Sequence, residues 1–150
     1  MPAVTIQDVA GFFLSLSPMT HKKLQKLCYY AQAWHLALFD TRLFNSSFEA
    51  WIHGPVCPDL YQDYKAFGWN DIPPITNPLP IDKATHDYLQ MVYDTYGEFN
   101  GDELEALCHT EKPWLNARKG LDEFEPSHNE ISEEDMKVYY RAKFEQDQND

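Results

Sequence analysis

The sequence predicts a mainly α-helical fold, a single compact domain of about six or seven helices with a small β-hairpin or extended arm near residues 42–53. Three features indicate this fold: helix-capping residues at four segment starts, apolar side chains spaced three or four apart, and one short alternating stretch. The 150 residues, 43% of them hydrophobic and 24% charged, are enough to bury one core.

Four segments begin with a capping residue flanked by two apolar residues that can pack together across the helix start. The capping residues are Thr5, Thr20, Asn100 and Ser132. After Thr20 the apolar side chains follow a helical stripe, which comprises Leu24, Leu27, Cys28, Ala31, Trp34 and Leu38. Further apolar residues lie off this stripe, so we expect the second helix to be central, with Trp34 and Leu38 in the core.

The next helices are predicted from the same periodicity and from glycines near their ends. They span about residues 56–67, 81–96 and 113–118. Residues 48–53 alternate apolar and polar side chains, which is typical of a strand. Because the turn-prone residues 45–47 come before them, we place the turn of the hairpin there.

We expect the helices to form one domain. Residues 69–80 contain four prolines and no periodicity, which predicts a loop. We assign residues 1–144 to the domain and residues 145–150 to a polar C-terminal tail.

The net charge of −12 argues against nucleic acid as a partner, because an acidic chain repels phosphate backbones. The one basic cluster is Lys22, Lys23 and Lys26, which we interpret as a solvated face of the second helix. No apolar run reaches the roughly 18 residues of a membrane span, and no signal peptide is recognisable. We therefore expect no membrane partner.

The sequence contains no familiar catalytic or metal-binding motif, so we expect no metal, cofactor or small-molecule substrate. Its scattered cysteines, Cys28, Cys57 and Cys108, predict free thiols in a reducing cytoplasm. Cys108 and His109 are adjacent and would point about 100° apart on a helix, so they cannot pair. A small hydrolase that uses His53 or His109 stays as the alternative to a binding protein.

One unusual segment, residues 50–61, combines aromatic side chains with a forced turn. Trp51 and His53 lie on the more polar side of the extended run. Gly54 and Pro55 predict a turn after them, because proline fixes φ and disfavours helix at the residue before it. Trp51 is either a contact residue or a core side chain.

A second unusual segment runs from His109 to Arg118. Arg118 follows Trp114 by four positions, so on a helix its guanidinium can stack on the indole. Tryptophan, tyrosine and arginine dominate the energetics of protein–protein interfaces. Both segments are therefore candidates for a contact surface.

The order of these motifs resembles the SocA-like antitoxin family, whose domain is also called Panacea and whose members are often labelled phage-associated. The matching stretches are LQKLCYYAQAW at residues 24–34, FEAWIHGPVCPDLY at 48–61, LCHTEKPWLNAR at 107–118, and the pair Tyr139 and Tyr140. The resemblance extends over most of the chain.

The resemblance implies an antitoxin of a type II-like toxin–antitoxin system, a non-enzymatic protein of bacterial or prophage origin that takes part in phage defence. Such a protein would neutralise a toxin encoded by the adjacent gene through direct stoichiometric binding in the cytoplasm. The motif positions expected to bind the partner are Trp51, His53, Tyr61, His109, Trp114 and Arg118. Gly54 and Pro55 are expected to form a structural turn.

Overall fold

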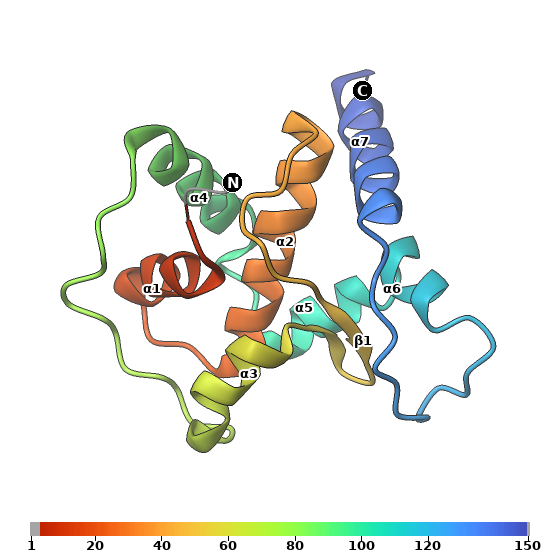
Figure 1. Cartoon of the computed structure of the whole chain (residues 1–150), viewed down its shortest axis with the longest axis horizontal. Coiled ribbons are helices and arrows are strands. Elements are labelled where there is room, and N and C mark those ends of the chain that lie inside the picture. The colour runs from red at the N-terminus through yellow and green to blue at the C-terminus, as the bar shows by residue number, and fades with distance from the viewer. Residues whose placement is uncertain (1–3, 150) are drawn as a thin grey trace.

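A computed structural model describes residues 4–149 and confirms a mainly helical domain with one small hairpin (Figure 1). Its α-helices are α1 (Ile6–Leu16), α2 (His21–Phe39), α3 (Pro58–Tyr64), α4 (Lys83–Tyr96), α5 (Gly101–Cys108), α6 (Lys112–Ala117) and α7 (Glu133–Asn149). A 3-10 turn, η1 (Lys65–Phe67), follows α3. The strands β1 (Glu49–Trp51) and β2 (Gly54–Val56) form an antiparallel pair.

The four capping residues act as the sequence predicts. Thr5 and Asn100 each form a reciprocal capping box, with Asp8 and Glu103 respectively. The Thr20 hydroxyl accepts a hydrogen bond from the Lys23 amide. The Ser132 hydroxyl accepts one from the Asp135 amide at 3.1 Å. These starts depend on local chemistry alone, because donor and acceptor are three residues apart.

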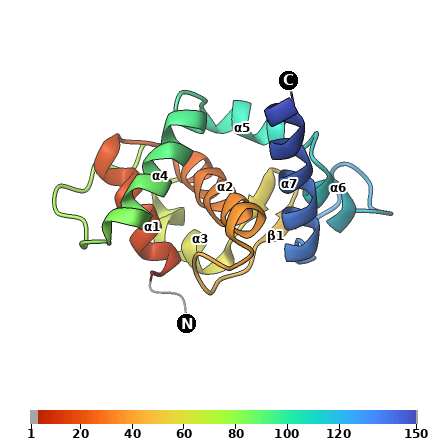
Figure 2. The ribbon, with the colours of Figure 1, turned by 90° about the horizontal axis from the view of Figure 1, so that it is seen from above.

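Helix α2 is central, as its apolar residues predict. It contacts α1, α3, α4, α5, α7 and β2, and Figure 2 shows it between α4 and α7. Residues that do not share one stripe, such as Leu27 and Tyr30, are both fully buried. Trp34 and Leu38 are only partly buried at the edge of the core, because the C-terminal part of α2 is less covered.

The hairpin is confirmed, but its turn differs from the one predicted at residues 45–47. Ile52 and His53 form the turn, and Trp51 pairs with Gly54. Neither turn residue has a positive φ, so Gly54, at φ 108°, supplies the backbone twist that lets the strands pair. Gly54 and Pro55 therefore lie in β2, directly after the turn.

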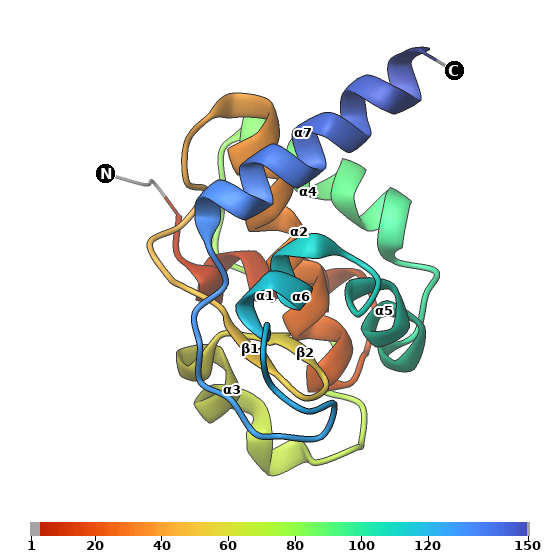
Figure 3. The same ribbon diagram turned by 90° about the vertical axis from the view of Figure 1, so that its right-hand side faces the viewer.

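A third segment supports the hairpin from the loop before α7, which Figure 3 shows passing beside it. The Ala50 amide donates to the Asn129 carbonyl at 2.8 Å, and the Ile131 amide donates to the Phe48 carbonyl at 2.8 Å. Two strands alone would be marginal in water, so this third segment and α2 together stabilise the hairpin.

Two buried glutamines of α2 pair with backbone that belongs to neither helix nor sheet. Gln25 bonds both polar backbone groups of Cys57, accepting from its amide at 2.8 Å and donating to its carbonyl at 3.0 Å. Gln32 accepts from the Leu43 amide at 2.8 Å and donates to the Phe44 carbonyl at 2.8 Å. Both ends of the segment from residue 43 to residue 57 are thereby attached to α2.

A buried carboxyl group joins α2 to α6 and α7. Glu111, just before α6, is 2% exposed, and burial raises its pKa. Its Oε1 accepts hydrogen bonds from the hydroxyl groups of Tyr30 at 2.7 Å and Tyr140 at 2.8 Å. These bonds compensate much of the cost of removing the carboxyl group from water.

Residues 145–149, which the sequence assigns to a polar tail, continue helix α7. Residues 1–3 of the expected domain and Asp150 of the expected tail lie outside the described residues. None of the helices within residues 4–149 has the length and apolar character that a membrane crossing requires.

Leu27→Ala should lower the free energy of unfolding by about 2–5 kcal/mol, because Leu27 is fully buried and its truncation leaves a cavity. Leu38→Ala should cost less, because Leu38 is partly exposed at the core edge. Urea denaturation of both variants measures the difference. Equal losses would contradict the position of Leu38 at the edge.

Candidate functional site

Half of the predicted site residues meet at one depression between α2, the hairpin and α3. Trp51, His53 and Tyr61 line it, and its volume is about 360 Å³. We call it the basic hollow. Its lining residues are His21, Lys22, Gln25, Lys26, Trp51, His53, Val56, Tyr61, Lys65, Gly68 and Trp69.

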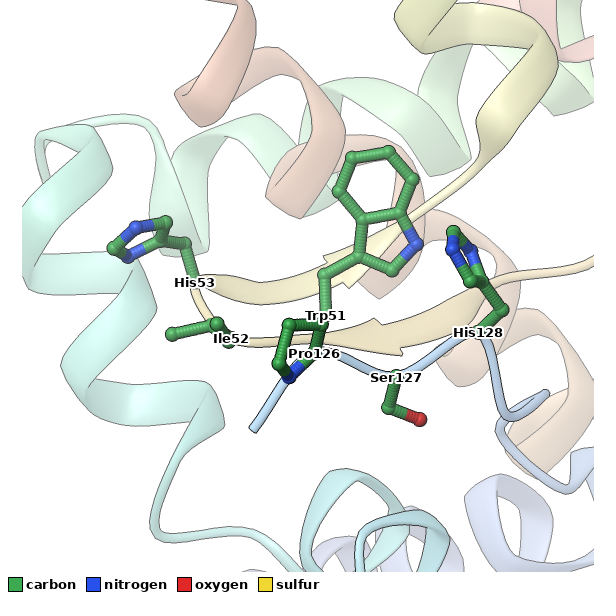
Figure 4. Close-up of a pocket in the computed structure, with 6 residues that line it drawn as sticks. All are labelled: Trp51, Ile52, His53, Pro126, Ser127 and His128. Atoms are coloured by element: carbon green, nitrogen blue, oxygen red, sulfur yellow. The ribbon is translucent and has the colours of Figure 1, made fainter. Parts of the chain in front are cut away.

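Trp51 also borders a second depression, the hairpin hollow, of about 220 Å³. Its lining residues are Trp51, Ile52, His53, Pro126, Ser127 and His128 (Figure 4). The half-buried indole of Trp51 meets Tyr61 edge-on at 5.0 Å and His128 edge-on at 6.0 Å between ring centroids. Trp51 is therefore shared by two adjacent surface depressions.

The other predicted site residues lie beneath the hairpin. Trp114 is 7% exposed and Arg118 is 6% exposed. The Trp114 indole donates to the Trp51 carbonyl at 2.8 Å, and Arg118 donates to the Ala50 carbonyl at 2.9 Å. The predicted cation–π pair between Arg118 and Trp114 is confirmed, at 5.2 Å to the ring centroid. Both side chains thus bind the backbone of β1.

His109 joins this layer by stacking on Trp114, with ring centroids 4.0 Å apart and an angle of 17° between the planes. Burial lowers the pKa of His109, which favours its neutral form. His53 lies on the exposed hairpin turn with its Nδ1 3.2 Å from Glu105. The two histidines of the hydrolase hypothesis therefore occupy different environments, one stacked and one at the rim of the basic hollow.

Lys26 is buried, which contradicts its interpretation as part of a solvated face. It is 1% exposed, and its ammonium group donates to the Pro55 carbonyl at 3.3 Å. Removal from water lowers its pKa to about 8. The sequence signal for this burial is the position of Lys26 four residues before Tyr30, on the second apolar side of α2.

Gly54 is required where Lys26 passes the hairpin. A Cβ atom at position 54 would lie 2.8 Å from Cε of Lys26, closer than side-chain carbons approach one another. Together with its positive φ, this close approach explains why glycine follows the turn.

The lysine side chains around the basic hollow differ in their contacts with carboxylate groups. Lys22 forms ion pairs with Asp102, at 2.8 Å, and with Glu105. Lys65 is exposed on η1. Lys65 and Trp69 have no local sequence signal, because the fold alone brings them beside α2.

The three thiols are buried and unlinked. Burial raises the pKa of Cys108 to about 12, so this thiol is protonated at neutral pH and is a poor nucleophile. Within residues 4–149, no group of three or more His, Cys, Asp or Glu side chains is arranged to hold a metal ion.

An apolar groove of about 220 Å³ crosses α2, α4 and α7 on another part of the surface. Its lining residues include Trp34, Tyr88, Met91 and Phe144. None of the six predicted site residues lines it.

This chain belongs to the SocA-like antitoxin family, as a match to the family model over more than half of its length shows. Residues 24–115 match the family model described as "Antitoxin SocA-like, Panacea domain". This match confirms the resemblance noted in the sequence.

A named relative is "Antitoxin SocA" of Caulobacter vibrioides (strain NA1000 / CB15N). It is 31% identical to this chain over 111 residues, which cover 65% of this chain and 58% of that protein. No solved structure matches the chain.

Lys26→Met should change the pH dependence of stability. The pKa of Lys26 is about 8 in the folded chain against the ordinary 10.5, so between these values the unfolded chain holds more protons. Stability of the natural chain should therefore rise with pH in this window. Relative to Lys26→Met, it should gain about 2 kcal/mol between pH 7 and pH 9.5.

Urea denaturation at the two pH values measures this gain. The matched control is Lys119→Met, which removes an exposed lysine. It should change the free energy of unfolding by less than about 0.5 kcal/mol at either pH. A difference between the natural chain and Lys26→Met that is the same at both pH values would contradict the lowered pKa of Lys26 in the folded chain.

Proposed function

We propose that this chain is a type II-like antitoxin that neutralises a toxin encoded by the adjacent gene through direct stoichiometric binding. The observation that carries the proposal is the convergence of Trp51, His53 and Tyr61 at the basic hollow. These residues come from a hairpin and a helix that both pack on α2. A preorganised surface of this kind suits tight binding, because little order is lost when the partner docks.

Trp51 is the principal anchor in this proposal. Its indole NH donates to Glu49 at 2.9 Å, and its ring is braced by Tyr61 and His128. A half-buried tryptophan held in one orientation is the type of side chain that dominates binding energy. The flanking depressions give a partner room to close around it and exclude water.

Trp114 and Arg118 have a different role in the proposal. Both are buried, and each donates a hydrogen bond to a carbonyl group of β1. We infer that they act on the partner through the position of Trp51, with His109 stacked behind Trp114. Replacing them should therefore lower stability as well as binding.

The net charge of −12 fits a partner with a basic surface, because such a charge accelerates the encounter of the two proteins. We propose that the complex forms in the cytoplasm and serves phage defence. Its formation involves no nucleic acid, membrane, cofactor or small-molecule substrate. Neutralisation by binding also means that the chain is not an enzyme, so one antitoxin chain is needed for each toxin.

Trp51→Ala should weaken binding to the adjacent-gene toxin by about 2 kcal/mol, a 30-fold rise in Kd. Its melting temperature should change little, because the ring is partly exposed. Arg118→Met should lower both binding and melting temperature, because it frees buried carbonyl groups. Titration calorimetry and thermal melts measure the two effects.

The matched control is Phe39→Ala, which removes a 55% exposed aromatic ring at the opposite end of α2. It should leave binding unchanged. Failure of the natural chain to bind the toxin or to rescue cells would refute the antitoxin proposal. If Trp51→Ala binds the toxin as tightly as the natural chain does, the toxin contacts another surface of the protein.

A further inference from the structure

The basic hollow carries a local charge opposite to that of the whole chain. Lys22, Lys26 and Lys65 line it, and its lining contains neither aspartate nor glutamate. The chain as a whole has a net charge of −12. Asp102 and Glu105 neutralise Lys22 from outside the lining, so Lys26 and Lys65 supply the positive potential of this depression.

The cation available at the floor of this hollow is Lys26. Its neighbour Lys22 is already paired with Asp102 and Glu105. The ammonium group of Lys26 has three N–H donors, and among the described residues its hydrogen-bond acceptor is the Pro55 carbonyl oxygen. Lys26 is 1% exposed and therefore has little water to satisfy the other donors. A hydrogen-bond acceptor from a partner could therefore bond the N–H donors of Lys26 that the Pro55 carbonyl leaves free.

The walls of the hollow are aromatic. Trp51 and Tyr61 form one side. Trp69, which is 74% exposed, stacks on His21 with ring centroids 6.4 Å apart and an angle of 24° between the planes. Such walls suit an apolar side chain that enters next to a charged one.

We propose that the basic hollow receives an aspartate or glutamate side chain of the toxin, which binds Lys26 and Lys65 while a neighbouring apolar residue packs on Trp51 and Trp69. This inference rests on the proposed function and names the chemistry of the partner at the same surface. It also identifies Lys26 and Lys65 as residues that determine specificity, because a partner without a carboxylate here would leave Lys26 unpaired.

A carboxylate fits better than a phosphate. Asp102 and Glu105 at the rim neutralise Lys22 and would repel a group with more than one negative charge. At the N-terminus of α2 the Lys23 amide is already bonded to the Thr20 hydroxyl, which leaves fewer backbone donors for a phosphate. A carboxylate carries a single negative charge, so Asp102 and Glu105 repel it less than they repel a phosphate.

The test measures binding of purified variants to the adjacent-gene toxin. Lys26→Met keeps the length of the side chain and removes its charge, and a thermal melt verifies that it folds. Lys65→Glu changes an exposed side chain, so it should fold normally. We expect at least a 30-fold loss for Lys26→Met and a 10-fold loss for Lys65→Glu. Lys65→Arg and the exposed control Lys119→Glu should each change Kd less than threefold.

A double-mutant cycle identifies the carboxylate. Each toxin aspartate or glutamate is replaced by its amide and tested against the natural chain and Lys26→Met. One amide variant should weaken binding to the natural chain and have little further effect on Lys26→Met. If no toxin carboxylate couples to Lys26, the inference is wrong.

Two other outcomes separate the possible failures. If Trp51→Ala weakens binding while Lys26→Met and Lys65→Glu bind normally, the carboxylate inference fails and the antitoxin proposal stands. If the natural chain does not bind the toxin at all, the antitoxin proposal itself fails. Binding of ADP or inorganic phosphate, detected by tryptophan fluorescence and abolished in Lys26→Met, would show a phosphate site and overturn the inference.

Discussion

The two amide side chains of Gln25 and Gln32 constrain the whole of the candidate site. Buried backbone groups outside helices and sheets need partners, and each glutamine provides both a donor and an acceptor. Gln25 is bonded to Cys57, and Gln32 to Leu43 and Phe44. With both ends attached to α2, the segment between them is positioned with the hairpin beside α3. The basic hollow is the space that this attachment creates between the two helices and the hairpin.

Two buried side chains, Arg118 and Trp114, hold the hairpin by hydrogen bonds to the backbone of β1. Arg118 donates to the Ala50 carbonyl and to carbonyl groups of the following loop, among them Glu125. Trp114 donates to the Trp51 carbonyl. The backbone of β1 is thus fixed by Trp114 and Arg118, and the side chains on the outer surface of β1 are the ones that can reach a partner. The segment of residues 50–61 therefore supplies the side chains that can contact a partner, and the segment of residues 109–118 holds that surface in place. Both segments contain residue types that are common at interfaces.

Local spacing explains what the sequence predicts correctly. The caps at Thr5 and Asn100 and the stacking of Arg118 on Trp114 each involve residues three or four positions apart. The sequence pattern misplaces the turn of the hairpin because Phe48 pairs with the loop before α7, about 80 residues later, and this partner has no local signal. The position of Lys26 on the second apolar side of α2 indicates burial, but β2, which covers it, lies 29 positions later in the chain and has no local signal. The convergence of Trp51, Tyr61 and Lys65 likewise depends on tertiary packing.

Hydrogen exchange of the chain, alone and in complex with the adjacent-gene toxin, tests the location of the contact surface most directly. If the toxin docks at the basic hollow, peptides covering residues 51–69 should exchange more slowly in the complex, because they form the hairpin turn, α3 and η1. Peptides from residues 88–96, which line the apolar groove of α2, α4 and α7, should be unchanged. Protection confined to residues 88–96, with none at 51–69, would contradict the account.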